Sequence, residues 1–154
     1  TQAELVAKET DVLEAPGNRG TVLLVEDEPF VAMVARQALE DHGFEVTVVS
    51  HGEAAIGHAR ALAADAGRAD PILAIVDVGL PDMRGDAVVN ALRAILPGLP
   101  VIVATGYGTE GLDLDFGAEA RTALLEKPYD GQALEQALGG LGLLLPTPEA
   151  AAAV

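Results

Sequence analysis

Short apolar runs and longer segments with a helical spacing of apolar residues alternate along most of this chain. Four runs, at residues 21–26, 72–76, 100–104 and 122–126, are rich in Val, Ile and Leu and show little polar alternation. Such runs are typical of parallel strands that are buried on both faces of a sheet. With a further strand expected at residues 44–49, the sequence predicts a five-stranded parallel sheet.

Helices are expected after the strands. The apolar positions favour helices over residues 29–42, 52–65, 86–96 and 130–140. The first has Pro29 in its first turn and Gly43 just beyond its end, positions that favour these residues. The segment after residue 104 is rich in Gly and acidic residues, so its helix should be short, frayed or mobile. We therefore predict an α/β fold, a (βα)5 three-layer sandwich with right-handed crossovers.

The composition narrows the class of protein. The chain has 154 residues and a formal net charge of −15, which argues against direct contact with nucleic acid or an anionic membrane. It has no Cys, which excludes disulfides, thiolate metal sites and cysteine nucleophiles. No apolar segment approaches the roughly 20 residues of a membrane span, and no secretory signal opens the chain. We expect a soluble cytoplasmic protein with a domain at residues 21–140, a linker at 1–20 and a loose tail at 141–154.

Polar residues with chemical use directly follow four of the predicted strands. Asp27 and Asp77 come after the first and third, Thr105 after the fourth and Lys127 after the fifth. Because the carboxyl ends of parallel strands meet at the ligand-binding edge of an α/β sheet, these side chains should converge. Two carboxylates about 4 Å apart repel by about 4 kcal/mol, which requires a proton or a cation to offset it. Without Cys or a His cluster, these oxygen ligands indicate Mg²⁺ or Mn²⁺.

The same residues suit phosphoryl chemistry. Asp77 is expected at an exposed junction between its strand and the Leu80-Pro81-Asp82 turn, where its carboxylate can attack phosphorus. Lys127, opposite two acids, is suited to hold a phosphoryl oxygen. The alternatives are structural: Asp77 would cap its loop, Thr105 would be a β-former and Lys127 a solvated charge. For Glu28 we favour the structural role of a helix N-cap.

One motif points to a different class of ligand. Residues 106–111 read G-x-G-x-x-G after a strand, the pattern of dinucleotide-binding loops. That pattern also requires an amphipathic helix, a further strand and an acidic residue about 20 positions on, and the segment here makes a poor helix. Nucleotide binding is therefore disfavoured. The histidines, which we expect at the surface away from the carboxyl edge of the sheet, are His42, His51 and His58.

The ordered set of motifs resembles the receiver domain of two-component response regulators. It comprises LLVEDEP, IVDVGLPDMRG, VIVATGYG and EKPY, and it extends over about residues 20–140. Each piece alone is weak, whereas the four in this order are highly specific. The resemblance implies a CheY-like, flavodoxin-like fold with strand order 2-1-3-4-5. It also implies a signalling function, in which a histidine kinase or a histidine phosphotransfer protein donates a phosphoryl group.

The resemblance also implies roles for individual residues. Asp77 would be the phosphoacceptor, and Glu26 and Asp27 would be the acidic pair that holds Mg²⁺. Asp77 and the backbone carbonyl of Gly79 would be further ligands of the metal. The residues placed around the phosphoryl group are Thr105 as the switch hydroxyl, Lys127 as a direct contact and Pro128 as a cis-proline.

Two positions depart from the family pattern. Leu124 stands where the family usually has an aromatic switch residue, so Gly106 and Tyr107 are the candidates to modulate the switch instead. Gly79 lacks the side chain that orients hydrolytic water in many relatives. We therefore expect an altered lifetime of the phosphorylated state.

Three functions are compatible with these residues. The first is a receiver module in a phosphorelay, either a single-domain regulator or the C-terminal receiver of a hybrid histidine kinase. Such a chain is a signalling domain and not an enzyme, has no DNA-binding part, and is expected to be a monomer or weak dimer. The second is a Mg²⁺-dependent phosphohydrolase with an aspartyl intermediate, although Gly79 replaces its second acid and a cap domain is missing. The third is a degenerate receiver that serves only as a protein-binding scaffold.

Overall fold

A single parallel sheet of five strands forms the centre of the computed structural model, in the order β2-β1-β3-β4-β5. The structure describes residues 19–65, 67, 69–106, 111–112, 114–116 and 120–143. The strands are β1 (Thr21–Val25), β2 (Glu45–Val49), β3 (Leu73–Asp77), β4 (Val101–Thr105) and β5 (Thr122–Glu126). The predicted sheet and its order are confirmed. Most of the predicted linker and most of the predicted tail lie outside the described residues.

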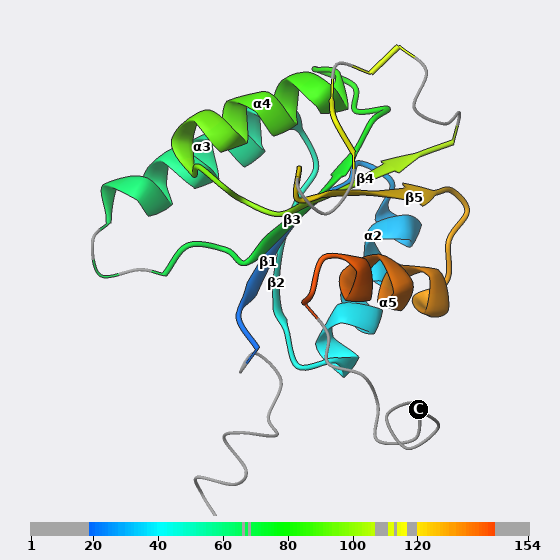
Figure 1. The fold of residues 1–154 in the computed structure, drawn as a ribbon. Coiled ribbons are helices and arrows are strands. Elements are labelled where there is room, and N and C mark those ends of the chain that lie inside the picture. Colours follow the sequence, from blue (N-terminus) through cyan, green and yellow to red (C-terminus); the bar gives the residue numbers. More distant parts are fainter. Residues whose placement is uncertain are drawn as a thin grey trace, which may run out of the picture.

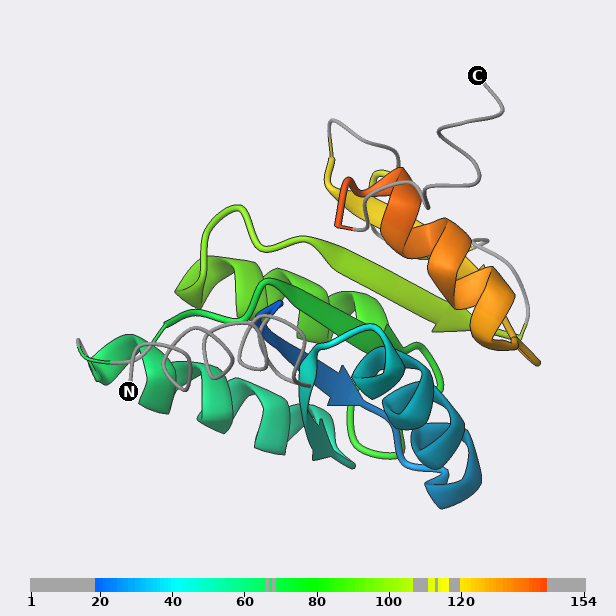
Figure 2. The ribbon, with the colours of Figure 1, turned by 90° about the horizontal axis from the view of Figure 1, so that it is seen from below.

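Helices cover both faces of the sheet. They are α2 (Pro29–Asp41), α3 (Gly52–Ala64), α4 (Gly85–Ile95) and α5 (Gly131–Gly140). Figures 1 and 2 show α3 and α4 side by side on one face, and α2 and α5 on the other. The predicted three-layer arrangement is therefore correct, and each helix lies within one residue of its predicted bounds. None of the helices in the described part of the chain has the length and apolar character that a bilayer crossing requires.

The connection from β4 to β5 departs from the regular alternation. Among its described residues, none belongs to a helix, so helices follow four of the five strands there. Instead, the side chains of Leu112, Leu114 and Phe116 pack against the apolar cluster beneath α3 and α4. The glycines and acidic residues of this segment disfavour a helix, while its spaced apolar residues still cover that part of the core. Tyr107 lies outside the described residues.

Burial explains why the central strands lack polar alternation. Every residue of β3 and β4 is buried, because one set of side chains faces α3 and α4 and the other faces α2 and α5. The edge strand β2 is only partly covered, and Val48 is 37% exposed. The apolar layers on the two faces hold the carboxyl ends of β1, β3, β4 and β5 at one edge of the sheet.

Gly85 fits against the backbone that follows β3. A Cβ atom at this position would lie 2.7 Å from Val78 Cα and 2.9 Å from the Asp77 carbonyl oxygen. We therefore expect Gly85→Ala to lower the free energy of unfolding by about 1–3 kcal/mol, the usual cost of overpacking. Gly57→Ala is the matched control, because a Cβ there meets nothing within 4 Å and helix propensity predicts a gain of about 0.5–1 kcal/mol. Urea denaturation distinguishes the two, and an equal effect of both substitutions contradicts the prediction.

Candidate functional site

The carboxyl edge of the sheet brings together the polar residues at the ends of four strands. Asp77 is the last residue of β3 and Thr105 the last of β4, while Lys127 directly follows β5. The register of the sheet fixes their relative positions. The backbone N–H of Val78 donates to the Ala104 carbonyl over 2.9 Å, and that of Lys127 donates to the Thr105 carbonyl over 2.8 Å. These bonds hold the ends of β3, β4 and β5 level with one another.

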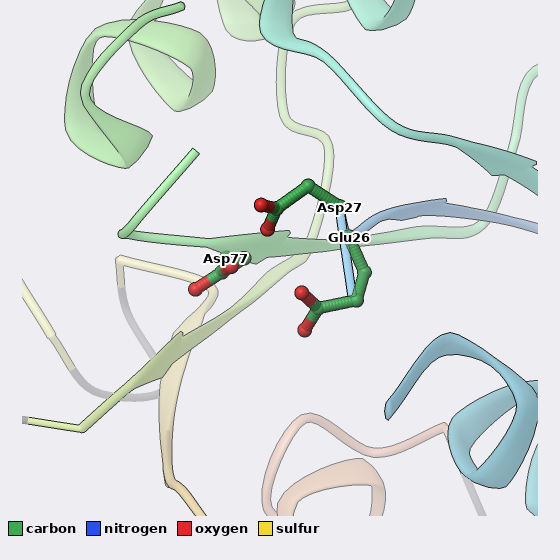
Figure 3. Close-up of side chains that lie close together, drawn as sticks. All are labelled: Glu26, Asp27 and Asp77. Atoms are coloured by element: carbon green, nitrogen blue, oxygen red, sulfur yellow. The ribbon is translucent and has the colours of Figure 1, made fainter. Parts of the chain in front are cut away.

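Three carboxylates converge at this edge. Glu26, Asp27 and Asp77 each place an oxygen atom within 4.8 Å of the other two, and Figure 3 shows these side chains grouped at the ends of β1 and β3. Glu26 and Asp77 are buried, at 3% and 4% exposure, whereas Asp27 is more accessible. The prediction of an exposed Asp77 was therefore wrong, because the neighbouring side chains cover it. A set of carboxylate oxygens without nitrogen or sulfur suits a small hard cation such as Mg²⁺.

Lys127 is the positive charge of the site. Its Nζ atom lies 2.9 Å from Glu26 Oε1 and 3.1 Å from Asp77 Oδ1, and its side chain is 18% exposed. Burial acts to lower the pKa of Lys127, but the bonds to Glu26 and Asp77 outweigh it and raise the pKa above its usual value. The ammonium therefore stays charged and bridges the two buried carboxylates. The Lys127–Pro128 peptide that follows is cis.

The two buried carboxylates differ in their affinity for protons. Burial raises the pKa of Glu26 to about 7, against the opposing effect of Lys127. Burial also acts on Asp77, but the Gly79 N–H at 3.1 Å, Glu26 and Lys127 outweigh it and lower the pKa of Asp77. When the pair holds one proton, that proton is therefore on Glu26, while Asp77 is ionised.

Glu28 contacts the carboxylate cluster through its backbone and not through its side chain. Glu28 occupies the N-cap position of α2, as predicted, but its side chain makes no capping hydrogen bond. Its backbone N–H donates instead to Glu26 Oε2 over 3.2 Å. Gly106 directly follows β4, and Leu124 lies within β5, level with Val103 of β4. The hydrogen bond from the Glu28 backbone N–H orients the Glu26 carboxylate of the site.

Two features of this edge were not predicted from the sequence. The Asp82 carboxylate accepts hydrogen bonds from the backbone N–H groups of Gly52 and Glu53, at 2.9 and 3.0 Å, and so caps α3 from a distant loop. Bonds from Glu53 and Gly52 lower the pKa of Asp82. His51, predicted to lie away from this edge, follows β2 and therefore lies at it. A cap supplied from another loop leaves no local signal, because the usual N-cap pattern is read from neighbouring residues.

Comparison with known proteins gives the family. Residues 22–139 match the family described as the response regulator receiver domain. Because the match covers most of the chain, the protein belongs to this family, whose members act in two-component regulatory systems. The CheY-like fold that the motifs implied is thereby confirmed.

The relatives include regulators and a sensor kinase. The chain is 34% identical to the photosynthetic apparatus regulatory protein RegA of Cereibacter sphaeroides, covering 89% of this chain and 70% of RegA. It is 33% identical to the sensor kinase CckA of Brucella abortus, covering 82% of this chain but 13% of the kinase. With the probable transcriptional regulatory protein TcrX of Mycobacterium tuberculosis, the identity is 41%, and the match spans 59% of this chain and 36% of TcrX. The chain thus corresponds to one part of each of these proteins.

Solved structures support the same assignment. The crystal structure of the receiver domain from the hybrid histidine kinase CckA is 30% identical, with a TM-score of 0.63. The likeness covers 79% of this chain and 99% of that one. A response regulator receiver protein from Sinorhizobium medicae is 27% identical, also with a TM-score of 0.63, and covers 84% of this chain and 95% of that one. Receiver domains alone therefore account for nearly the whole described fold.

Proposed function

We propose that this receiver domain takes a phosphoryl group from a phosphohistidine onto Asp77. The observation that supports the proposal most directly is the setting of Asp77 at the end of β3. Its carboxylate lies 3.1 Å from the Lys127 ammonium and within 4.8 Å of two further carboxylates. The lowered pKa of Asp77 keeps it ionised, and therefore nucleophilic, at neutral pH.

The acidic cluster is the proposed metal site. Glu26, Asp27 and Asp77 would hold Mg²⁺, or Mn²⁺, together with the backbone carbonyl of Gly79. The three side chains place their oxygen atoms close enough together for one small cation. When bound, the cation offsets the negative charge that the carboxylates and the phosphoryl oxygens bring to one place.

The transfer step uses residues of the chain itself. The Asp77 carboxylate forms a P–O bond while the P–N bond of the donor histidine breaks. The electron pair of that bond stays on the imidazole, which takes up a proton, and nothing is oxidised or reduced. Lys127, already 3.1 Å from Asp77, pairs with an oxygen of the transferred group. The acyl phosphate carries roughly −2 charge, so the Thr105 hydroxyl moves to donate a hydrogen bond to it.

The donor protein is expected to dock beside Lys127 on the first turns of α2. Phe30 and Met33 are exposed there, at 71% and 59%, which is unusual for large apolar side chains. A cavity of about 370 Å³ next to them is lined by residues that include Val31, Val34, Lys127, Pro128 and Tyr129. Exposed apolar side chains beside a reactive group mark a protein contact. The proposed partner is a histidine kinase or a histidine phosphotransfer protein, because either would carry the phosphohistidine that donates the group.

Acetyl phosphate provides a direct test of the proposed function. The protein is incubated with this donor and Mg²⁺, and its intact mass is measured. We expect a gain of one phosphoryl group, as the Asp77 carboxylate attacks phosphorus and acetate leaves. A mass that stays unchanged contradicts the proposal and favours a scaffold without phosphoacceptor function. Repeated turnover of a phosphomonoester contradicts it in another direction, because that result indicates a phosphohydrolase.

The pKa of Glu26 predicts how Mg²⁺ binding depends on pH. Because this pKa is raised to about 7, the cation displaces a proton below that pH and meets an ionised carboxylate above it. The apparent affinity should therefore rise roughly tenfold per pH unit below about pH 7 and level off above it. Calorimetric titrations at several pH values measure this, with Glu26→Gln as the control that binds more weakly but without this dependence. An affinity that is constant across this range contradicts the prediction.

A further inference from the structure

Arg84 joins two segments that leave the proposed site from different strands. It lies at the end of the loop after β3, where its Nε and Nη2 atoms donate to Asp86 Oδ1 and Oδ2, both over 3.1 Å. Nη2 also donates to the backbone carbonyl of Gly111, in the segment after β4. The Asp86 carboxylate is 7% exposed, so this pair fixes the direction in which the guanidinium points.

The Arg84–Asp86 turn lies directly against the backbone of Asp77. Gly85, between the two residues, donates its N–H to the Val78 carbonyl over 3.3 Å. A Cβ atom at Gly85 would lie 2.9 Å from the Asp77 carbonyl oxygen, so the two backbones are in close contact. A displacement of the backbone around Asp77 therefore reaches Arg84 without an intervening gap.

The other end of the link lies on the surface next to α4. Gly111 precedes Leu112, Leu114 and Phe116, which pack on the apolar cluster beneath α3 and α4. The same segment leaves the sheet at Thr105, the residue proposed to move toward the phosphoryl group. The loop after β3 and the segment after β4 both start at the site, where their strands are paired. The Arg84 guanidinium connects them again, away from the sheet.

One position in β5 usually carries an aromatic switch residue in the family, but this chain has no aromatic ring there. Leu124, a partly buried aliphatic residue, stands there instead. We propose that Arg84, oriented by Asp86, is a positioning residue that couples the phosphorylation state of Asp77 to the surface formed by residues 111–112 and 114–116. This inference rests on the proposed phosphoacceptor function and adds a route by which that site changes a distant surface.

Hydrogen–deuterium exchange of the intact chain tests the coupling. In the wild-type protein, acetyl phosphate and Mg²⁺ should change the exchange rate of the peptide that contains residues 111–116 by about fivefold, the lower end of ordinary allosteric coupling. Arg84→Gln should still gain the phosphoryl group by intact mass, but this peptide should exchange faster from the start and no longer respond. Arg36→Gln is the matched control, since the Arg36 guanidinium pairs with Glu40 of the same helix, α2, and not with the loops after β3 and β4. It should behave as the wild type.

The outcomes separate the two proposals. A phosphorylated Arg84→Gln protein whose peptide 111–116 responds as in the wild type overturns the coupling and leaves the phosphoacceptor function intact. A wild-type protein that gains no mass overturns the phosphoacceptor function itself. Asp86→Asn tests the coupling a second time, in case Arg84→Gln has a folding defect. Asn has nearly the same shape as Asp, but it lacks the charge that orients the Arg84 guanidinium. A weakened response is expected in this variant, and a full wild-type response again overturns the coupling.

Discussion

Asp77→Asn and Asp77→Ala should each gain no phosphoryl group from acetyl phosphate and Mg²⁺, while the wild-type protein gains one. The physical reason is that neither an amide nor a methyl group can form the acyl phosphate. Both variants should remain folded, because the apolar layers of β3 stay in place and Asn still accepts the Gly79 N–H bond. Intact mass measures the labelling, and circular dichroism measures the fold.

A matched control shows whether labelling is specific to this carboxylate. Asp70 is exposed and precedes β3, at the opposite end of that strand from Asp77. Asp70→Asn removes the same charge and should be labelled as fully as the wild type. Full labelling of either Asp77 variant refutes the assignment of the phosphoacceptor and directs attention to Asp27, the more accessible carboxylate of the cluster.

Lys127→Met should slow phosphoryl transfer by about 10²–10³-fold, the usual effect of removing one preorganised charge from a reacting oxygen. Met keeps much of the length and apolar character of the stem but leaves Glu26 and Asp77 without the ammonium that lies 2.9 and 3.1 Å from them. The loss also removes an influence that lowers the pKa of Glu26, so that pKa should rise above about 7. The initial rate of labelling by acetyl phosphate at saturating Mg²⁺ gives the measurement.

Two further results would make the role of Lys127 specific. Lys127→Arg keeps a positive charge near the carboxylates and should retain more of the rate than Lys127→Met. Equal rates for Met and the wild type show that the charge is not needed for transfer. A slow rate in Lys127→Met that returns to normal at Mg²⁺ concentrations above those that saturate the wild-type protein shows instead that Lys127 acts on metal binding, through the protonation of Glu26.

The sheet and the position of the site could be predicted from the local sequence. Each central strand is an apolar run that ends at a polar residue, and the carboxyl ends of parallel strands meet at the ligand-binding edge of the sheet. Asp77, Thr105 and Lys127 were placed together for that reason, and the structure puts them at one edge. The spacing of apolar residues likewise marked the four helices, because each needs one face against the sheet.

Contacts between distant loops could not be predicted from the sequence and became known only from the tertiary structure. Asp82 caps α3 although thirty positions separate it from Gly52, and Arg84 reaches Gly111 across a comparable interval. Neither pairing can be predicted from the spacing of apolar residues, because the partner of a surface side chain depends on how the loops are arranged in space. The protonation of Glu26 is of the same kind, since it depends on burial and on distances to Asp77 and Lys127. Sequence alone therefore determined which residues end the strands, and the tertiary structure determined their charges and their connections, because electrostatic and hydrogen-bond energies depend on distances in space.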